Sequence, residues 1–340
     1  MRYRDAGVDI ARSDALKRRL GALVRGTWTP AVRPISGGFA GVMRGPGPGR
    51  LLAATLDGVG TKLHLALAAG RVADAAADVV YHGADDLLVH GGRPLALLDY
   101  VAMAKLDPEV VEAVVDGLAR ACRAVGAVLL GGETAEMPDT YLPGVVDVAG
   151  CMIGEVAEGE LLDGSRVRDG DAILGLASDG LHTNGFSLAR RVLSRSGLSL
   201  DAPLPGGSGE SVGEALLAPH RWYGPALAPL LPRVHALAHV TGGGIAGNLA
   251  RVVPDGLGAR LDAGAWARPA VFRWLIAAGG VPEEDARAAL NLGIGMVAVV
   301  DAGDAAEIAR RLAGAGERVT PIGVVTADAG GVNWTDAERA

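Results

Sequence analysis

The chain has 340 residues, 49% hydrophobic and 21% charged, a size and composition that allow two domains with substantial cores. Its net charge of −7 and the lack of a basic stripe argue against a nucleic-acid partner. The N-terminus lacks the apolar region of a secretory signal, and no uncharged apolar run reaches the roughly 18 residues of a membrane span. We therefore expect a cytoplasmic protein without a membrane segment.

The first predicted elements are an amphipathic helix within residues 13–26 and a glycine-rich segment, SGGFAGV. Gly37 and Gly38 lie in this segment, which either closes over phosphates or forms a hairpin corner. Taken alone, the pattern favours the corner.

A second glycine motif, DGVGTKL, follows a short apolar run that predicts a strand, and a helical pattern over 62–70 comes next. A strand, a glycine turn and a helix start present backbone N–H groups to an anion. Asp57 can hold a divalent cation, and Lys62 can neutralise phosphate. The alternative is a plain strand–turn–helix corner with a surface lysine. The motif is not a Walker A loop, since G-x-x-x-x-G-K-[ST] is absent.

Helical and strand patterns then alternate along the chain, which indicates an α/β or α+β first domain. The expected elements are a helix over 76–91, a strand over 95–105, a helix over 109–125 with Asp107 as N-cap, and strands over 127–138 and 145–156. Asp57, Asp86 and Glu133 each lie near an expected turn, with Glu133 just past a strand end. Together they could converge on one metal ion, although each acid alone is more often a cap or a solvated turn residue.

A polar connector over 164–171 divides the chain into expected domains 1–163 and 164–340. After a strand over 172–178, the loop DGLHTNGFS leads into a helix start that suits a sugar or phosphate. His182 in this loop is a candidate acid, base or phosphate ligand, or a structural histidine. A strand over 290–301, a helix over 302–316 and a strand over 319–326 indicate that the second domain is also α/β.

The segment HVTGGGI places Thr241 and three glycines before another helix start. Ordered glycines cost more backbone entropy than other residues, so this run favours close approach of a ligand over an ordinary helix entry.

Taken together, these motifs resemble the aminoimidazole ribonucleotide synthetase family, also called phosphoribosylformylglycinamidine cyclo-ligase. The resemblance runs nearly end to end and includes YRDAGVDI, GGFAG, DGVGTKL, LLDYVAMAKLD, GGETAEMP, GLHTNGFSL, AHVTGGGI and NLGIGM. A wider superfamily of ATP-using enzymes, with hydrogenase-maturation, selenophosphate and thiamin-phosphate members, shares the acid and glycine pattern but lacks GGETAEMP and GLHTNG.

The resemblance implies an α/β, or α+β, fold of two domains, in which the N-terminal sheets of a homodimer pair into a β-barrel with flanking helices. It implies that ATP and Mg²⁺ drive ring closure of formylglycinamidine ribonucleotide to aminoimidazole ribonucleotide in purine biosynthesis. An amide oxygen is a poor leaving group, and phosphorylation makes it a good one. Phosphoryl transfer depends mainly on positioning and on cancelling negative charge.

The resemblance also assigns roles to single residues. The metal ligands would be Asp57, Asp86 and Glu133, and the catalytic candidates Lys62 and His182. The nucleotide site would comprise Gly37, Gly38, Asp57, Gly58, Gly60, Thr61, Lys62, Asp86, Gly91 and Gly92. The substrate site would comprise His182, Asn184, Ser187, Thr241, Gly242 and Gly243.

Five residues depart from the family's usual pattern: Asp85 for Asn, His90 for Gln, Arg93 for Glu, Asp139 for Gly and Asp179 for Ser. A second acid beside Asp86 adds charge that could alter metal preference. These departures leave open a cyclase with a changed substrate or a small-molecule kinase of the same superfamily. A non-catalytic nucleotide-binding protein is disfavoured because the three acids and Lys62 are all present.

Overall fold

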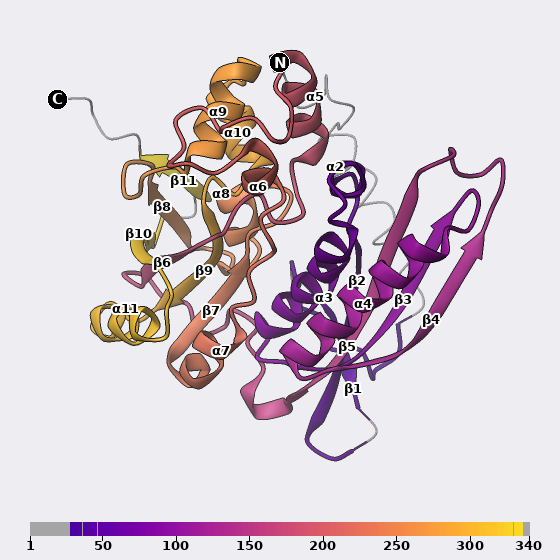
Figure 1. Ribbon diagram of the computed structural model, residues 1–340. Coiled ribbons are helices and arrows are strands. Elements are labelled where there is room, and N and C mark those ends of the chain that lie inside the picture. Colours follow the sequence, from indigo (N-terminus) through magenta and orange to yellow (C-terminus); the bar gives the residue numbers. More distant parts are fainter. Residues whose placement is uncertain (1–27, 36, 46, 329, 336–340) are drawn as a thin grey trace.

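In the computed structural model, residues 28–335 are described except 36, 46 and 329. They form two regions side by side, each built on one mixed sheet (Figure 1). The expected helix within residues 13–26 lies outside the described residues. In the described part of the chain, no helix is both long and apolar enough to cross a membrane.

The first sheet has five strands in the order β1-β2-β5-β3-β4. Its strands are β1 (Gly41–Arg44), β2 (Arg50–Gly58), β3 (Arg93–Met103), β4 (Val128–Glu136) and β5 (Val146–Ala157). Neighbouring strands are antiparallel except β3 and β4, which run parallel because a helix connects them. This sheet is open, and the described residues of one chain form no closed barrel.

Helices α2 (Lys62–Ala68), α3 (Val72–Leu88) and α4 (Pro108–Val125) accompany this sheet. The predicted N-cap of α4 is confirmed, because the Asp107 side chain accepts hydrogen bonds from Glu109 N and Val110 N at 3.1 and 3.3 Å. Helices α3 and α4 approach closely at Gly117, where an added Cβ would lie 2.0 Å from Ala73 O. Only glycine allows this approach without a backbone shift.

The second sheet has six strands in the order β11-β8-β10-β6-β9-β7. Its strands are β6 (Ala172–Ala177), β7 (Val234–His239), β8 (Gly258–Asp262), β9 (Ile294–Val300), β10 (Val319–Thr326) and β11 (Val332–Thr335). Every residue of β9 is buried, as expected for an uninterrupted apolar run in an interior strand of a covered sheet.

The helices of this region are α5 (Phe186–Ser196), α6 (Val212–Leu216), α7 (Gly224–Leu227), α8 (Gly244–Leu249), α9 (Ala270–Gly279), α10 (Glu283–Ala289) and α11 (Ala305–Gly314). Single 3₁₀ turns occupy Glu158–Glu160 and Ala228–Arg233. Residues 212–233 form only short helical pieces, with Pro225, Pro229 and Pro232 in the interrupted part.

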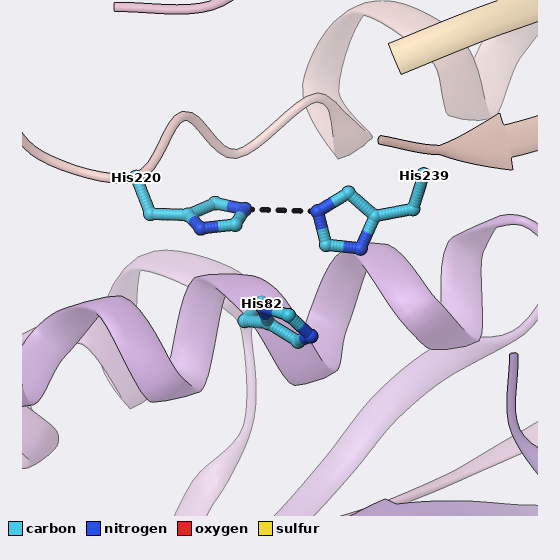
Figure 2. A group of neighbouring side chains, drawn as sticks. All are labelled: His82, His220 and His239. Carbon is cyan, nitrogen blue, oxygen red and sulfur yellow. Dashed lines mark hydrogen bonds between the residues drawn. The ribbon is translucent and has the colours of Figure 1, made fainter. Parts of the chain in front are cut away.

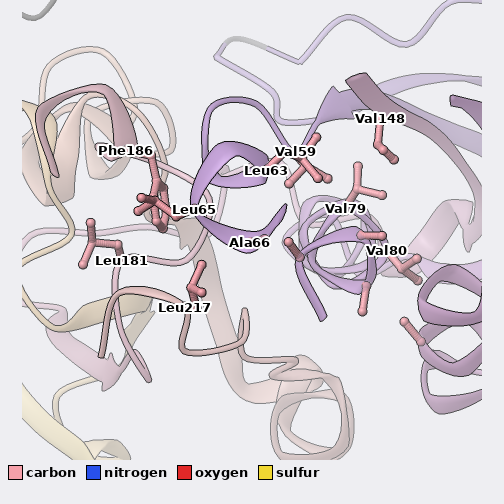
Figure 3. Packing of buried hydrophobic residues seen from close by; sticks show 14 of the residues in the cluster. Val59, Leu63, Leu65, Ala66, Val79, Val80, Val148, Leu181, Phe186 and Leu217 are labelled. Atoms are coloured by element: carbon pink, nitrogen blue, oxygen red, sulfur yellow. The ribbon is translucent and has the colours of Figure 1, made fainter. Parts of the chain in front are cut away.

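A continuous apolar core joins the two regions at α2. Leu65 and Ala66 of this helix lie between Val79 and Val80 of α3 on one side and Phe186 of the second region on the other (Figure 3). The helix that begins in the DGVGTKL motif is thus packed between the two regions. It fixes how the end of β2 faces the second region.

Two expectations about the chain differ from the structure. Glu133 was expected just past a strand end, but β4 continues through it to Glu136, since the glycines before it remain in register with β3. Strands β1, β7, β8 and β11 and helices α9 and α10 were not predicted. The boundary between residues 163 and 164 stays a prediction; it falls between the last strand of one sheet and the first of the other.

Candidate functional site

The candidate site lies where the end of β2, helix α3 and three segments of the second region meet. Asp57 comes from β2, and Asp78, His82, Asp85 and Asp86 come from α3. The second region supplies His182, His220 and His239, from the loop after β6, the segment before α7 and the last residue of β7. Except for Asp57, all of these residues are buried.

Asp57 and Asp86 come together around His82. Nε2 of His82 lies 2.9 Å from Asp57 Oδ2 and 3.7 Å from Asp86 Oδ2. Asp86 also contacts Nδ1 of His239 at 2.9 Å and accepts a hydrogen bond from the Thr55 hydroxyl at 3.1 Å. Asp57 keeps half of its side chain exposed and accepts from Gly58 N at 2.7 Å. The structure thus brings together two of the three acids that the sequence proposes for a metal.

The two carboxylates control the ionisation of His82. Burial by itself lowers the pKa of His82, but the charges of Asp86 and Asp57 outweigh it and raise that pKa above its ordinary value. Burial also opposes ionisation of the acids, yet the pKa of Asp57 and that of Asp86 fall below the usual range because His82 faces both. Two carboxylates beside one imidazole carry a net negative charge whether or not the ring is protonated, and this charge attracts a cation.

Lys62 does not present its ammonium group to a phosphate here. The side chain is 1% exposed, and Nζ donates to Asp78 Oδ2 at 2.5 Å, Ala218 O at 2.8 Å and His182 O at 3.2 Å. An ammonium group has three donors, and these three acceptors satisfy all of them. We expected a phosphate partner in the turn, with a surface lysine as the alternative, whereas the side chain is buried in this structure. Lys62 instead ties α2 to α3 and to the second region.

His182 lies in a strained backbone conformation inside the loop of the second region. Its φ of 59° falls in the left-handed region, and its ring stacks on that of His220 with centroids 4.1 Å apart. Nδ1 of His182 is buried without a hydrogen-bond partner. Burial, followed by the nearby positive groups, lowers the pKa of His182 well below its ordinary value. This environment favours the neutral form of the ring.

The four glycines expected to let phosphates approach make close contacts within the protein. Arg251 donates through Nε to Gly37 O at 2.6 Å and through Nη2 to Gly38 O at 2.8 Å, and its guanidinium covers the Phe39 ring. Gly91 and Gly92 form the turn after α3. A Cβ at Gly92 would lie 2.9 Å from Leu87 O, so close packing by itself accounts for a glycine at this position.

Ser187, one of the residues expected to bind substrate, lies beside the start of α2. Ser187 Oγ is 3.4 Å from the hydroxyl of Thr61, a contact that joins the two regions next to Gly60. An open groove of about 690 Å³ follows, lined by Leu65, Ser187, Arg190, Arg191, Leu193, Ser194, Gly197 and Leu198. Basic and hydroxyl side chains along this groove suit a phosphate.

The glycine run before α8 is held by Asn248. Its amide donates to Gly244 O at 2.8 Å, and its Oδ1 accepts from the Thr241 hydroxyl at 3.2 Å. A Cβ at Gly242 would lie 3.3 Å from Oδ1 of Asn184, so these two residues are neighbours. Gly243 has a φ of 107°, which side chains rarely adopt.

Glu133 stands apart from the other two acids. Across the first sheet, Asp57 of β2 is the neighbour of Gly150 of β5. Gly150 is in turn the neighbour of Asp99 of β3, and Asp99 that of Gly132 of β4. Three strand spacings of about 4.8 Å put Gly132 roughly 14 Å from Asp57. Successive side chains along a strand point to opposite faces of the sheet, so Glu133 lies on the face opposite to that of Gly132 and Asp57. Within one chain, the structure does not bring Glu133 to Asp57 and Asp86.

Four of the five departures from the family pattern have local structural partners. His90 Nε2 accepts from Phe39 N at 2.9 Å, Arg93 pairs with Glu155, and Asp179 pairs with Arg221 through both oxygens at 3.1 Å. Asp139 has a φ of 63°, a conformation that favours glycine and that Asp tolerates. Asp85 accepts a hydrogen bond from Tyr223 N at 3.2 Å, and its other oxygen lies 3.5 Å from Nε2 of His220.

Sequence reasoning missed His82, His220 and His239. Any of them alone is a common core residue, and the three lie on elements far apart in the chain. The spacing of His82 and Asp86, four residues apart on one helix face, was the one available signal.

Two family descriptions match this chain. "AIR synthase related protein, N-terminal domain" covers residues 37–156, and "AIR synthase related protein, C-terminal domain" covers residues 168–334. A protein of Sorangium cellulosum (strain So ce56) named phosphoribosylformylglycinamidine cyclo-ligase is 48% identical over 95% of this chain and 94% of its own. A protein of the same name from Burkholderia mallei (strain SAVP1) is 43% identical over 96% of this chain and 93% of its own.

Solved structures share the fold at lower identity. Thiamine-monophosphate kinase from Stenotrophomonas maltophilia K279a superimposes with a TM-score of 0.65 at 21% identity, over 94% of this chain and 95% of its own. The hydrogenase maturation protein HypE from E. coli gives a TM-score of 0.62 at 20% identity, over 85% and 84%. AaThiL, solved with AMPPCP and TMP, gives 0.64 at 14% identity, over 99% and 97%.

Proposed function

The chain belongs to the phosphoribosylformylglycinamidine cyclo-ligase family, and from this premise we propose that it converts formylglycinamidine ribonucleotide to aminoimidazole ribonucleotide with ATP. The observation that carries the proposal is the 48% identity over 95% of the chain to a relative of that name. The kinases and maturation proteins share only the fold, since their identities lie below 25%. In the proposed reaction, the formyl amide oxygen accepts the terminal phosphoryl group of ATP, and the amidine nitrogen then bonds to that carbon as phosphate leaves.

The chemistry of Asp57 and Asp86 suits Mg²⁺ carried by ATP. Mg²⁺ prefers oxygen ligands and usually binds through one or two carboxylates together with phosphates. Asp57 is half exposed and Asp86 lies behind it, so phosphates would approach from the Asp57 side. Bound Mg²⁺ would neutralise the charge that develops on the transferred phosphoryl group.

The groove along α5 supports a place for the substrate's phosphate. Ser187 and Ser194 offer hydroxyl groups, and Arg190 and Arg191 offer charge at the same groove. Ser187 contacts Thr61, which directly precedes α2, so the substrate and nucleotide sides would meet at that helix. His182, whose buried Nδ1 has no hydrogen-bond partner, is the proposed proton acceptor for ring closure.

We also infer a homodimer that pairs the open faces of two N-terminal sheets. Leu56, Leu98, Val128 and Leu130 lie on β2, β3 and β4 and are 71%, 40%, 56% and 65% exposed. A sheet with one bare apolar face usually has a covering partner. Glu133 lies on this face, so its proposed role at a metal requires the second subunit.

A product assay tests the proposed function. Purified protein, ATP, Mg²⁺ and formylglycinamidine ribonucleotide should yield one phosphate and one aminoimidazole ring per turnover. A kinase would instead release a stable phosphorylated substrate, and a binding protein would retain ATP without releasing phosphate. Either of those two results would refute the cyclo-ligase assignment.

A further inference from the structure

Three histidines of the candidate site form a cluster that the proposed reaction does not require. His82 lies on α3, His220 precedes α7, and His239 ends β7 (Figure 2). One ring nitrogen from each lies within 4.8 Å of one from each of the others. All three side chains are buried. Imidazole nitrogens so close together in a buried site are a typical ligand set for late first-row metals.

The nitrogens of His239 and His220 are arranged as ligands would be. His239 directs Nδ1 at Asp86 Oδ1 at 2.9 Å, so a neutral ring donates there and keeps the lone pair of Nε2. That Nε2 lies 3.1 Å from Nε2 of His220. Two nitrogens on one tetrahedral Zn²⁺, each at about 2.0–2.1 Å, are roughly 3.3 Å apart. The Asp86–His239 contact is also the outer-shell pattern that orients metal-binding histidines.

Asp85 provides a second, independent observation. This carboxylate is fully buried, and its Oδ2 has no hydrogen-bond partner. Oδ2 lies 3.5 Å from Nε2 of His220, while Oδ1 accepts from Tyr223 N at 3.2 Å. A buried carboxylate oxygen without a partner is costly, and a cation at the cluster would compensate it.

We propose that Asp85, His82, His220 and His239 bind a late first-row divalent cation, with Zn²⁺ as the best match. The set of three nitrogens and one oxygen differs from the oxygen ligands that Mg²⁺ prefers. His82 is the ligand that must rearrange, because its nitrogens now contact Thr183 Oγ1 and Asp57 Oδ2, each at 2.9 Å.

The ion would join the two regions of the chain. Asp85 and His82 belong to α3 of the first region, whereas His220 and His239 belong to the second. Binding that occurs only in the folded state stabilises that state, so the metal should raise the melting temperature. This site goes beyond the proposed cyclo-ligase activity, and neither result depends on the other.

The test uses the full chain with any affinity tag removed. The protein is stripped with a chelator and loaded with Zn²⁺ in two ways, by incubation when folded and by refolding from urea. After gel filtration, elemental analysis should find one zinc per chain, and Tm should rise by several degrees in the presence of excess Mg²⁺. Loading with Co²⁺ should give the visible absorption of a four-coordinate ion.

Two variants and one matched control locate the ion. Asp85→Asn should weaken zinc binding by at least about tenfold, and this variant should fold because Asn is the usual residue there in the family. His220→Gln should abolish stoichiometric binding. His235→Gln is the control, since His235 lies on β7 but pairs with Asp171, and it should bind zinc like the unaltered chain. The proposal is overturned if the unaltered chain holds no zinc by either route, or if Asp85→Asn binds it equally well.

Discussion

Single residues at the candidate site separate into those that bind and those that hold the protein together. Lys62 belongs to the second group, because Asp78 and two carbonyl groups occupy its donors. Asp78 in turn accepts from His220 N at 2.8 Å. Asp57, with half of its side chain exposed, is free to meet a ligand.

Replacing Lys62 with methionine tests its structural role. Lys62→Met leaves the buried Asp78 charge uncompensated, so unfolding should require about 3–5 kcal/mol less free energy. Urea denaturation measures this change. The double variant Lys62→Met/Asp78→Asn should recover part of the loss, because Asn removes the charge and still accepts from His220 N. Unchanged stability with a raised KM for ATP would instead assign Lys62 to phosphate binding.

Replacing Asp57 with asparagine tests the proposed metal site. Asn keeps an oxygen that can accept from Gly58 N but removes the charge that would hold Mg²⁺. We expect kcat/KM for ATP to fall by about 10²-fold or more, with little change in stability. Steady-state phosphate release at saturating Mg²⁺ is the measurement. Asp116→Asn, on the exposed side of α4, is the matched control; equal kinetics for both variants would refute the assignment.

At the scale of elements, α3 organises the molecule. Fourteen of its 17 residues are buried, because one side covers the first sheet and another meets the second region. This one helix carries Asp78, His82, Asp85 and Asp86 into the space between the regions. Its position depends on α4, which packs against it through the close approach at Gly117.

A methyl group at that approach should disturb α3. In Gly117→Ala, the new Cβ would lie 2.0 Å from Ala73 O, and the two helices must separate. We expect a loss of about 1–3 kcal/mol or more in unfolding free energy. Gly314→Ala in α11 is the control, because nothing lies within 4 Å of its Cβ. That change should stabilise the protein by up to about 1 kcal/mol, and a similar loss in both variants would contradict the packing argument.

At the scale of the whole molecule, the two sheets are covered differently. Strand β9 of the second sheet is buried throughout, whereas the first sheet leaves apolar side chains exposed on the face opposite α3. The register aligns Leu56 and Leu98 with Cys151 between them, so these exposed residues form one continuous row.

A charge in that row should separate the proposed dimer. We expect the unaltered chain to show about twice its mass of 34.5 kDa by light scattering during gel filtration. Leu56→Asp should shift it to the monomer without unfolding it, since Leu56 is 71% exposed in one chain. The control is Val115→Asp on α4, 37% exposed and away from the row. A monomeric unaltered chain, or a dimer unaffected by Leu56→Asp, would refute this interface.

The sequence by itself determined the order of most elements, the cap of α4 and the family, because caps, apolar periods and ordered motifs are local features of the chain. It also pointed to Asp57 and Asp86 through their places beside turns and helices. Only the tertiary structure decided that Lys62 is buried in an ion pair, that Glu133 faces away from Asp57, and that three histidines distant in the chain come together, with Asp85 beside His220. Such contacts depend on which faces and registers meet when the two regions pack, and no local pattern encodes that outcome.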